Sequence, residues 1–220
     1  MRTRVKICCI KSLEEAEMAV RAGADALGLV GAMPSGPGVI GDALAAQIAA
    51  SIPPPVASFL LSSETQADAL AEHVRRVNPT ALQIVSHIEP AAHERLDTLI
   101  GGTGIKRVQV IHVEDEQALD LIERYEPFVD AFLLDSGRPS ASIPELGGTG
   151  RAHDWRISAS FVERTKRPVF LAGGLGPSNA VEAIETVRPF GIDLCSSVRT
   201  EDRLDETELS ALMAAVRSCA

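Results

Sequence analysis

The chain has 220 residues, of which 45% are hydrophobic and 23% charged. These fractions lie close to the globular averages of about 45–50% and about 25%, so they exclude disordered and collagen-like architectures. The length allows one large domain or two small ones. Aromatic residues make up only 4% of the chain, and we therefore expect an aliphatic core.

The formal net charge is −9, and no run of Lys or Arg is longer than two residues. A protein that binds nucleic acid is not expected from this balance. The apolar run at 5–10 is too short for a signal peptide or a membrane span, so we expect a cytoplasmic protein without membrane contact. The cysteines lack the spacing of a metal site, and in a reducing compartment we expect thiols rather than disulfides. They are Cys8, Cys9, Cys195 and Cys219.

Short runs rich in Val, Ile and Leu alternate along the chain with helical patterns. The first expected helix is the best marked, because Ser12 and Glu15 form a capping box and Gly23 supplies the stop. Further helices are expected to begin near Gly41, Ser63, Pro90, Glu114, Arg156, Pro177 and Asp205. We expect strands over 5–9, 26–30, 56–61, 81–85, 106–110, 131–134, 169–171 and 192–196.

The expected strands are continuously apolar, which indicates burial on both faces of a parallel sheet and excludes an antiparallel sandwich. Eight strand and helix units of about 27 residues each match the size of a (β/α)₈ barrel. The prediction is an α/β protein with one such barrel over residues 1–220, since no linker or low-complexity segment marks an internal boundary. An open doubly wound sheet is the alternative.

Chemically useful residues stand at the ends of the expected strands, where a parallel barrel places its active site. Cys8 ends the first strand and Asp135 follows the sixth. A thiolate can act as a general base and a carboxylic acid as a general acid, and Lys6 could stabilise the thiolate from the same strand face. Asp135 would need an apolar setting to keep its proton. The alternative is that Cys8 only packs in the core and Asp135 only caps a loop.

Small residues end the last two expected strands. Gly173 and Gly174 follow the seventh strand, and Ser196 and Ser197 end the eighth. Main-chain N–H groups at such positions can approach a phosphate, which commonly binds after strands seven and eight of these barrels. We therefore expect a phosphate site here. The alternative is that the glycines only form a tight turn.

Six short motifs follow in order along the chain. They are Lys6-Ile7-Cys8, Gly23-Ala24-Asp25-Ala26-Leu27-Gly28, Leu133-Leu134-Asp135-Ser136, Gly147-Gly148-Thr149-Gly150 with Asp154-Trp155, Leu171-Ala172-Gly173-Gly174-Leu175, and Asp193-Leu194-Cys195-Ser196. In these motifs the chain resembles the phosphoribosylanthranilate isomerase family. That family forms a (β/α)₈ barrel and catalyses, without a cofactor, the Amadori rearrangement of N-(5′-phosphoribosyl)anthranilate in tryptophan biosynthesis.

The resemblance implies roles for individual residues. Cys8 would be the general base at the sugar C2, and Asp135 the general acid that opens the ribose ring. Contacts with the phosphorylated sugar are expected from Lys6, Gly148, Gly150, Gly173, Gly174, Asp193, Ser196 and Ser197. We assign no metal, because His73, His87, His93 and His112 lack the spacing of a metal-ligand set.

The chain also departs from the family pattern. Cys9 replaces a glycine, and Gly38 of the stretch Gly36-Pro37-Gly38 stands where the family usually has an arginine that pairs with the anthranilate carboxylate. Arg199 or Arg138 could replace that arginine, but we favour the alternative that each is an exposed loop residue. Two other functions therefore stay open. One is a relative acting on another phosphorylated sugar, and the other is a barrel that binds a phosphate compound without catalysis.

Overall fold

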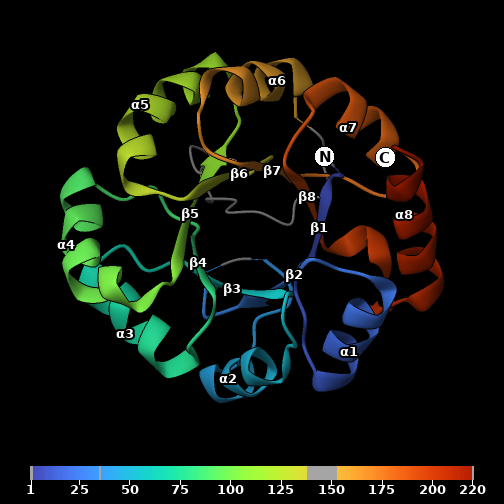
Figure 1. Cartoon of the computed structure of the whole chain (residues 1–220), viewed down its shortest axis with the longest axis horizontal. Coiled ribbons are helices and arrows are strands. Elements are labelled where there is room, and N and C mark those ends of the chain that lie inside the picture. Colours follow the sequence, from blue (N-terminus) through green and yellow to red (C-terminus); the bar gives the residue numbers. More distant parts are fainter. Residues whose placement is uncertain (1, 35, 138–152, 220) are drawn as a thin grey trace.

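A computed structural model describes residues 2–34, 36–137 and 153–219 of the chain. Its centre is a closed barrel in which strands β1 to β8 follow one another in chain order and β8 pairs with β1. All eight pairings are parallel. Figure 1 shows the strands enclosed by a ring of helices. The predicted (β/α)₈ barrel is confirmed, and the open sheet is wrong because β1 and β8 close the ring.

All eight expected strands are present, with boundaries that differ by a few residues. They are β1 (Arg4–Ile7), β2 (Ala26–Val30), β3 (Ala57–Ser62), β4 (Ala81–Ile84), β5 (Lys106–His112), β6 (Ala131–Asp135), β7 (Val169–Leu171) and β8 (Gly191–Leu194). The helices around them include α1 (Leu13–Ala22), α2 (Asp42–Ser51), α3 (Ala67–Val77), α4 (Pro90–Ile100), α5 (Leu121–Tyr125), α6 (Trp155–Arg164), α7 (Ala180–Val187) and α8 (Glu206–Ser218). A two-stranded hairpin, β9 (Arg199–Thr200) with β10 (Arg203–Leu204), precedes α8.

The helix boundaries show where local signals decided the structure. Half of the expected capping box at α1 is present: the Ser12 hydroxyl accepts a hydrogen bond from the Glu15 N–H, whereas the Glu15 carboxylate accepts from the N–H of Lys11 and not from that of Ser12. Helices α3 and α7 begin three or four residues later than the sequence indicates. The segment after β5 starts as a 3₁₀ turn, Glu116–Asp120, and only then becomes α5. A side-chain cap thus predicts the first residue of a helix well. A lone serine or proline before an apolar pattern predicts it only to within a few residues.

The core has two parts, separated by the barrel wall. One lies between the outer face of the strands and the helices, and it includes Leu27, Leu60 and Phe132. The other fills the barrel interior with Phe59, Phe170 and smaller side chains. Every strand of a closed barrel is therefore buried on both faces, which explains the continuous apolar runs in the sequence. Among the described residues, no helix has the length and apolar character needed to cross a membrane.

His93 on α4 is fully buried and links the pH to the stability of the barrel. Its ring stacks on Phe128 and meets Tyr125 edge-on. Burial lowers the pKa of His93 from 6.5 to about 4. Below pH 6.5 the unfolded chain therefore binds a proton that the folded chain excludes, and acid destabilises the fold.

We expect the free energy of unfolding to fall by about 1.4 kcal/mol for each pH unit between roughly 6.5 and 4 through His93 alone. His93→Phe should flatten that part of the curve, because phenylalanine does not titrate. Urea unfolding at a series of pH values measures it. An unchanged slope in the variant would show that the destabilising proton binds elsewhere.

Candidate functional site

A cavity opens at the carboxyl ends of the barrel strands, where the sequence predicts the site. Its wall combines polar groups with aliphatic side chains. The polar and backbone part comprises Cys8, Cys9, Gln83, Asp135, Gly173, Gly174, Asp193, Cys195 and Ser196. The aliphatic part includes Val30, Met33, Leu61, Val85, Val110, Leu133 and Ala172.

Cys8 and Asp135 both line this cavity, so two side chains that are far apart in the sequence share one site. Cys8 follows β1 directly, and Asp135 is the last residue of β6. Burial raises the pKa of Asp135, as the sequence analysis required for a residue that holds a proton. The main-chain N–H of Ser136 donates to the Asp135 carboxyl at 2.7 Å and orients it.

The pKa of Cys8 differs from the expectation. Burial raises it to about 11, even though the Lys6 ammonium acts to lower it. Lys6 thus acts in the predicted direction, but the expectation of a pKa below that of a free thiol is wrong. The main physical reason is that burial of the thiol outweighs the effect of Lys6. In addition, the Lys6 Nζ lies 2.8 Å from Asp193 Oδ2, so a carboxylate compensates part of its charge. Asp193 itself also acts to raise the pKa of Cys8.

Lys6 is fully buried and stands in register with Asp193 on the neighbouring strand. It is not among the residues that line the cavity, although Asp193 is. Gly28 makes room for this arrangement: a Cβ there would lie 2.6 Å from the Cys8 sulfur and 3.1 Å from the Lys6 ammonium. Nothing in the sequence marks Gly28 as part of the site except its place in the second motif.

The glycines after β7 form a second wall. Gly173 and Gly174 both have positive φ, at 86° and 63°. A Cβ on Gly173 would lie 2.8 Å from the hydroxyl of Ser136, the residue that orients Asp135. The Asn179 side chain braces the same loop, because it donates to the Gly174 carbonyl and accepts from the Gly176 N–H.

The remaining predicted residues lie in different places. Ser196 lines the cavity, whereas Ser197 does not and packs instead beside Gly176. Gly148, Gly150 and Arg138 lie outside the described residues. Gln83 was not selected, yet it lines the cavity and is only 3% exposed. A polar residue inside the apolar run of β4 was the signal that could have found it.

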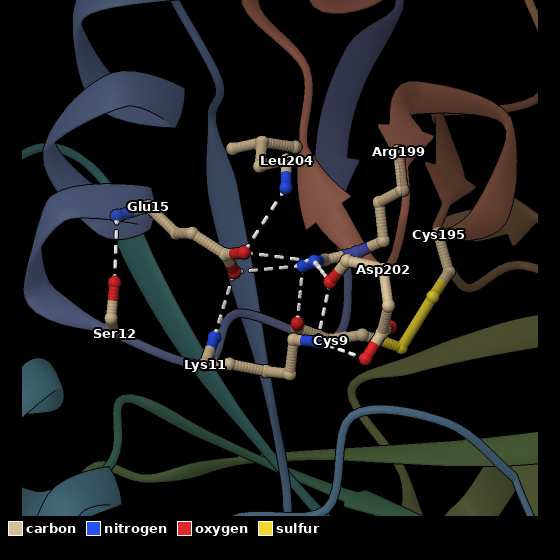
Figure 2. A network of polar contacts seen from close by, with 8 residues as sticks. All are labelled: Cys9, Lys11, Ser12, Glu15, Cys195, Arg199, Asp202 and Leu204. Carbon is tan, nitrogen blue, oxygen red and sulfur yellow. Dashed lines mark hydrogen bonds and ion pairs between the residues drawn. A yellow bond between two sulfur atoms is a disulfide. The ribbon is translucent and has the colours of Figure 1, made fainter.

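Arg199 does not replace the missing arginine. Its side chain is 4% exposed, and its guanidinium lies 2.9 Å from both carboxylate oxygens of Glu15. The sequence suggested either that Arg199 binds the carboxylate of the substrate or that it is an exposed loop residue. Both interpretations are therefore wrong. The cause is the turn into the β9–β10 hairpin, which directs the side chain toward α1 (Figure 2).

Cys9 and Cys195 form a disulfide, with Cα atoms 5.9 Å apart. The expectation of thiols throughout is wrong for this pair, because barrel closure places the ends of β1 and β8 side by side. Cys8 and Cys219 are free thiols. Cys9 also accounts for Gly38: a Cβ on Gly38 would lie 2.4 Å from the Cys9 Cβ, so the loop after β2 has no room there for a larger residue.

Comparison with known proteins decides the family. A family model described as N-(5′-phosphoribosyl)anthranilate (PRA) isomerase matches residues 5–214. The chain belongs to this family. An N-(5′-phosphoribosyl)anthranilate isomerase of Methanocella arvoryzae is 33% identical over 207 residues, which cover 94% of either chain. One from Haloferax volcanii is 36% identical over 219 residues, covering 98% of this chain and 94% of that protein.

Solved structures of the isomerase family superpose on the whole barrel. The enzyme from Thermus thermophilus has a TM-score of 0.81 at 28% identity, and the match covers 99% of this chain and 100% of that one. A phosphoribosyl anthranilate isomerase in complex with reduced 1-(o-carboxyphenylamino)-1-deoxyribulose 5-phosphate has a TM-score of 0.78 at 26% identity, covering 98% and 99%. The ordered motifs of the sequence thus identified the family correctly.

The buried pair of Lys6 and Asp193 predicts a large effect on stability. Lys6→Met would leave the Asp193 carboxylate buried without its partner, which typically costs about 3–5 kcal/mol of unfolding free energy. Asp193→Leu in the same chain should recover part of that loss. Urea unfolding measures both variants. Lys106→Met is the matched control, because Lys106 and its partner Asp130 are 65% and 37% exposed and such pairs contribute about 0–1 kcal/mol. Equal losses in Lys6→Met and the control would contradict the prediction.

Proposed function

We propose that the chain catalyses the Amadori rearrangement of N-(5′-phosphoribosyl)anthranilate, with Cys8 as the general base and Asp135 as the general acid. The observation that carries the proposal is that these two residues, on β1 and β6, line one cavity together with the glycines after β7. Membership of the isomerase family supports it. The product analogue bound by a related enzyme supports a substrate with a phosphate, a sugar chain and a carboxyphenyl group.

Asp135 supplies the first proton. Its raised pKa keeps a larger fraction of the carboxyl protonated than an exposed aspartate would have. Transfer of that proton to the ribose ring oxygen, with loss of the C1–O bond, opens the ring and leaves a cationic Schiff base at C1. Hydrogen bonding by Ser136 orients the carboxyl for this step.

Cys8 then removes the proton at C2. With a pKa of about 11 the thiol is protonated at neutral pH, and a cation nearby favours its ionisation. The Schiff base nitrogen provides such a cation and also makes the C2 proton more acidic. The electron pair of the C2–H bond moves to the C1–C2 bond, and the resulting enolamine becomes the ketone by proton transfer. The rearrangement is internal, so no outside oxidant or reductant is consumed.

The phosphate and the aromatic ring occupy opposite sides of the cavity in this proposal. Main-chain N–H groups around Gly173, Gly174 and Ser196 hold the phosphate, since these residues line the cavity and successive N–H groups of a turn can form a concave anion site. The anthranilate ring packs on the aliphatic wall formed by Met33, Leu61 and neighbouring residues. Substrate recognition then rests on the phosphate and the ring.

Turnover of phosphoribosylanthranilate, followed by the loss of its fluorescence, tests the proposal. Cys8→Ala and Asp135→Asn should each lower kcat by about 10²–10⁴, the usual contribution of general acid or base catalysis. Cys219→Ala and Asp120→Asn, which lie outside the cavity lining, are matched controls that should keep kcat. Absence of turnover by the unaltered protein would overturn the assignment, and full activity of Cys8→Ala would overturn the role of the thiol.

The contact between Gly38 and Cys9 predicts how the missing arginine can be restored. Gly38→Arg alone should fold less stably and bind substrate less well, because its Cβ would overlap Cys9. Cys9→Gly removes the shortest of these contacts and leaves an approach of 2.9 Å to the Cα, which a small shift of the loop must relieve. The double variant should then lower KM below that of Cys9→Gly alone through a new charge-assisted contact. Steady-state kinetics of the three variants decide this. Equal KM values for Cys9→Gly with and without the Gly38→Arg substitution would show that the position no longer faces the carboxylate.

A further inference from the structure

Cys9 occupies a backbone conformation that its side chain disfavours. Its φ is 62°, in the left-handed region where glycine is the usual residue. The surrounding structure must therefore hold it there. Two contacts do so: its side chain is bonded to Cys195, and its carbonyl accepts a hydrogen bond from the Arg199 guanidinium (Figure 2).

The second contact is itself rigidly supported. Glu15, in the first turn of α1, binds the Arg199 guanidinium through both carboxylate oxygens. The same carboxylate accepts from the main-chain N–H groups of Lys11 and Leu204, at 2.9 Å and 3.1 Å. Figure 2 shows Arg199 extending between Glu15 and the Cys9 carbonyl, with the disulfide on the other side of Cys9. Cys9 is thus tied at its main chain and at its side chain to the segment that follows β8.

The conformation of Cys9 acts directly on Cys8. A hydrogen bond from the main chain of Cys9 lowers the pKa of the Cys8 thiol and so opposes the effect of burial. That N–H belongs to the peptide joining Cys8 to Cys9, and its direction depends on the backbone torsions on either side of it. Releasing Cys9 from the left-handed region would move this donor away from the sulfur.

We propose that Cys9 is a positioning residue for the thiol of Cys8, and that its disulfide to Cys195 is a reversible brace that keeps the base in its reactive arrangement. The proposal rests on the proposed function for the role of Cys8 as base. With the brace closed, the peptide between Cys8 and Cys9 is fixed by the disulfide and by Arg199, next to the thiol. With the brace open, Arg199 alone opposes the preference of Cys9 for negative φ, and the thiolate loses part of its stabilisation.

Opening the brace is a two-electron reduction by a dithiol. One thiolate of the reductant attacks a sulfur of the disulfide, the bond between Cys9 and Cys195 breaks, and a mixed disulfide forms. The second thiolate of the reductant displaces the protein sulfur. The products are two protein thiols and the oxidised cyclic reductant. Both cysteines line the cavity, which gives a small dithiol a route to them.

The test uses four forms of the full chain: the oxidised protein, the same protein reduced with dithiothreitol, Cys195→Ser, and the double variant Cys9→Gly with Cys195→Ser. Glycine adopts positive φ without strain, so the double variant separates the missing disulfide from the released backbone. Cys219→Ser is the control, because Cys219 follows α8 directly and is outside the network. Two quantities are measured against pH: kcat, and the rate at which iodoacetamide alkylates Cys8, located by mass spectrometry.

Reduction and Cys195→Ser should each raise the alkylation midpoint of Cys8 by about one pH unit and lower kcat near pH 7.5 about tenfold, since one unit of thiol pKa is a tenfold change in thiolate. The double variant should recover the midpoint and the kcat that Cys195→Ser lost, and dithiothreitol should no longer affect it. Cys219→Ser should match the unaltered protein in the oxidised and the reduced state.

An alkylation midpoint that stays constant on reduction and in Cys195→Ser would overturn the proposal, whatever the turnover. A double variant as impaired as Cys195→Ser would also overturn it, because the disulfide would then act otherwise than through the backbone of Cys9. If the oxidised protein fails to turn over phosphoribosylanthranilate while the midpoint moves as expected, the proposed function fails and the brace stands. Reduction leaves the sequence unchanged. The comparison of the oxidised with the reduced protein therefore still tests the proposal if a variant fails to fold.

Discussion

The pairing of β1 with β8 is the constraint on which the site depends. It closes the barrel and aligns Lys6 with Asp193 at the centre of the interior. A little further along the same two strands, it brings Cys8 to the cavity and places Cys9 beside Cys195. An ion pair, the proposed base and a disulfide therefore follow one another along the paired strands β1 and β8 and the residues just after them, which we call the seam. An error of register between the two strands would separate these groups from their partners.

The seam also explains why the thiol has an unusual setting. Burying Cys8 favours its neutral form, whereas Lys6 and the Cys9 main chain favour the thiolate. Lys6 cannot prevail alone because Asp193 compensates its charge. Each of these neighbours is held by strand register or by contacts across the seam. The reactivity of Cys8 is thus a property of the closed barrel more than of the cysteine itself.

The sequence predicted the barrel, its eight strands, and the shared cavity of Cys8, Asp135 and the glycines after β7. These features depend on local patterns and on a fold whose strand ends converge, so they can be inferred without side-chain contacts. The disulfide, the position of Arg199 and the pKa of Cys8 could not be inferred in the same way. Arg199 depended on the direction of one hairpin turn, and Cys8 on the balance between burial and a partly compensated cation. The disulfide was accessible in principle, because a closed barrel makes the first and last strands neighbours.

The links across the seam join the two ends of the chain. Cys9 and Cys195 are 186 residues apart, and Glu15 and Arg199 are 184 apart. On the ribosome β1 is made before β8 and waits for its partner while all the residues between them are synthesised. During that interval Cys9 is an unpaired thiol next to Cys8, and Lys6 has no counter-ion from β8. The nascent chain therefore cannot have its complete pocket before β8 has been made and has paired with β1.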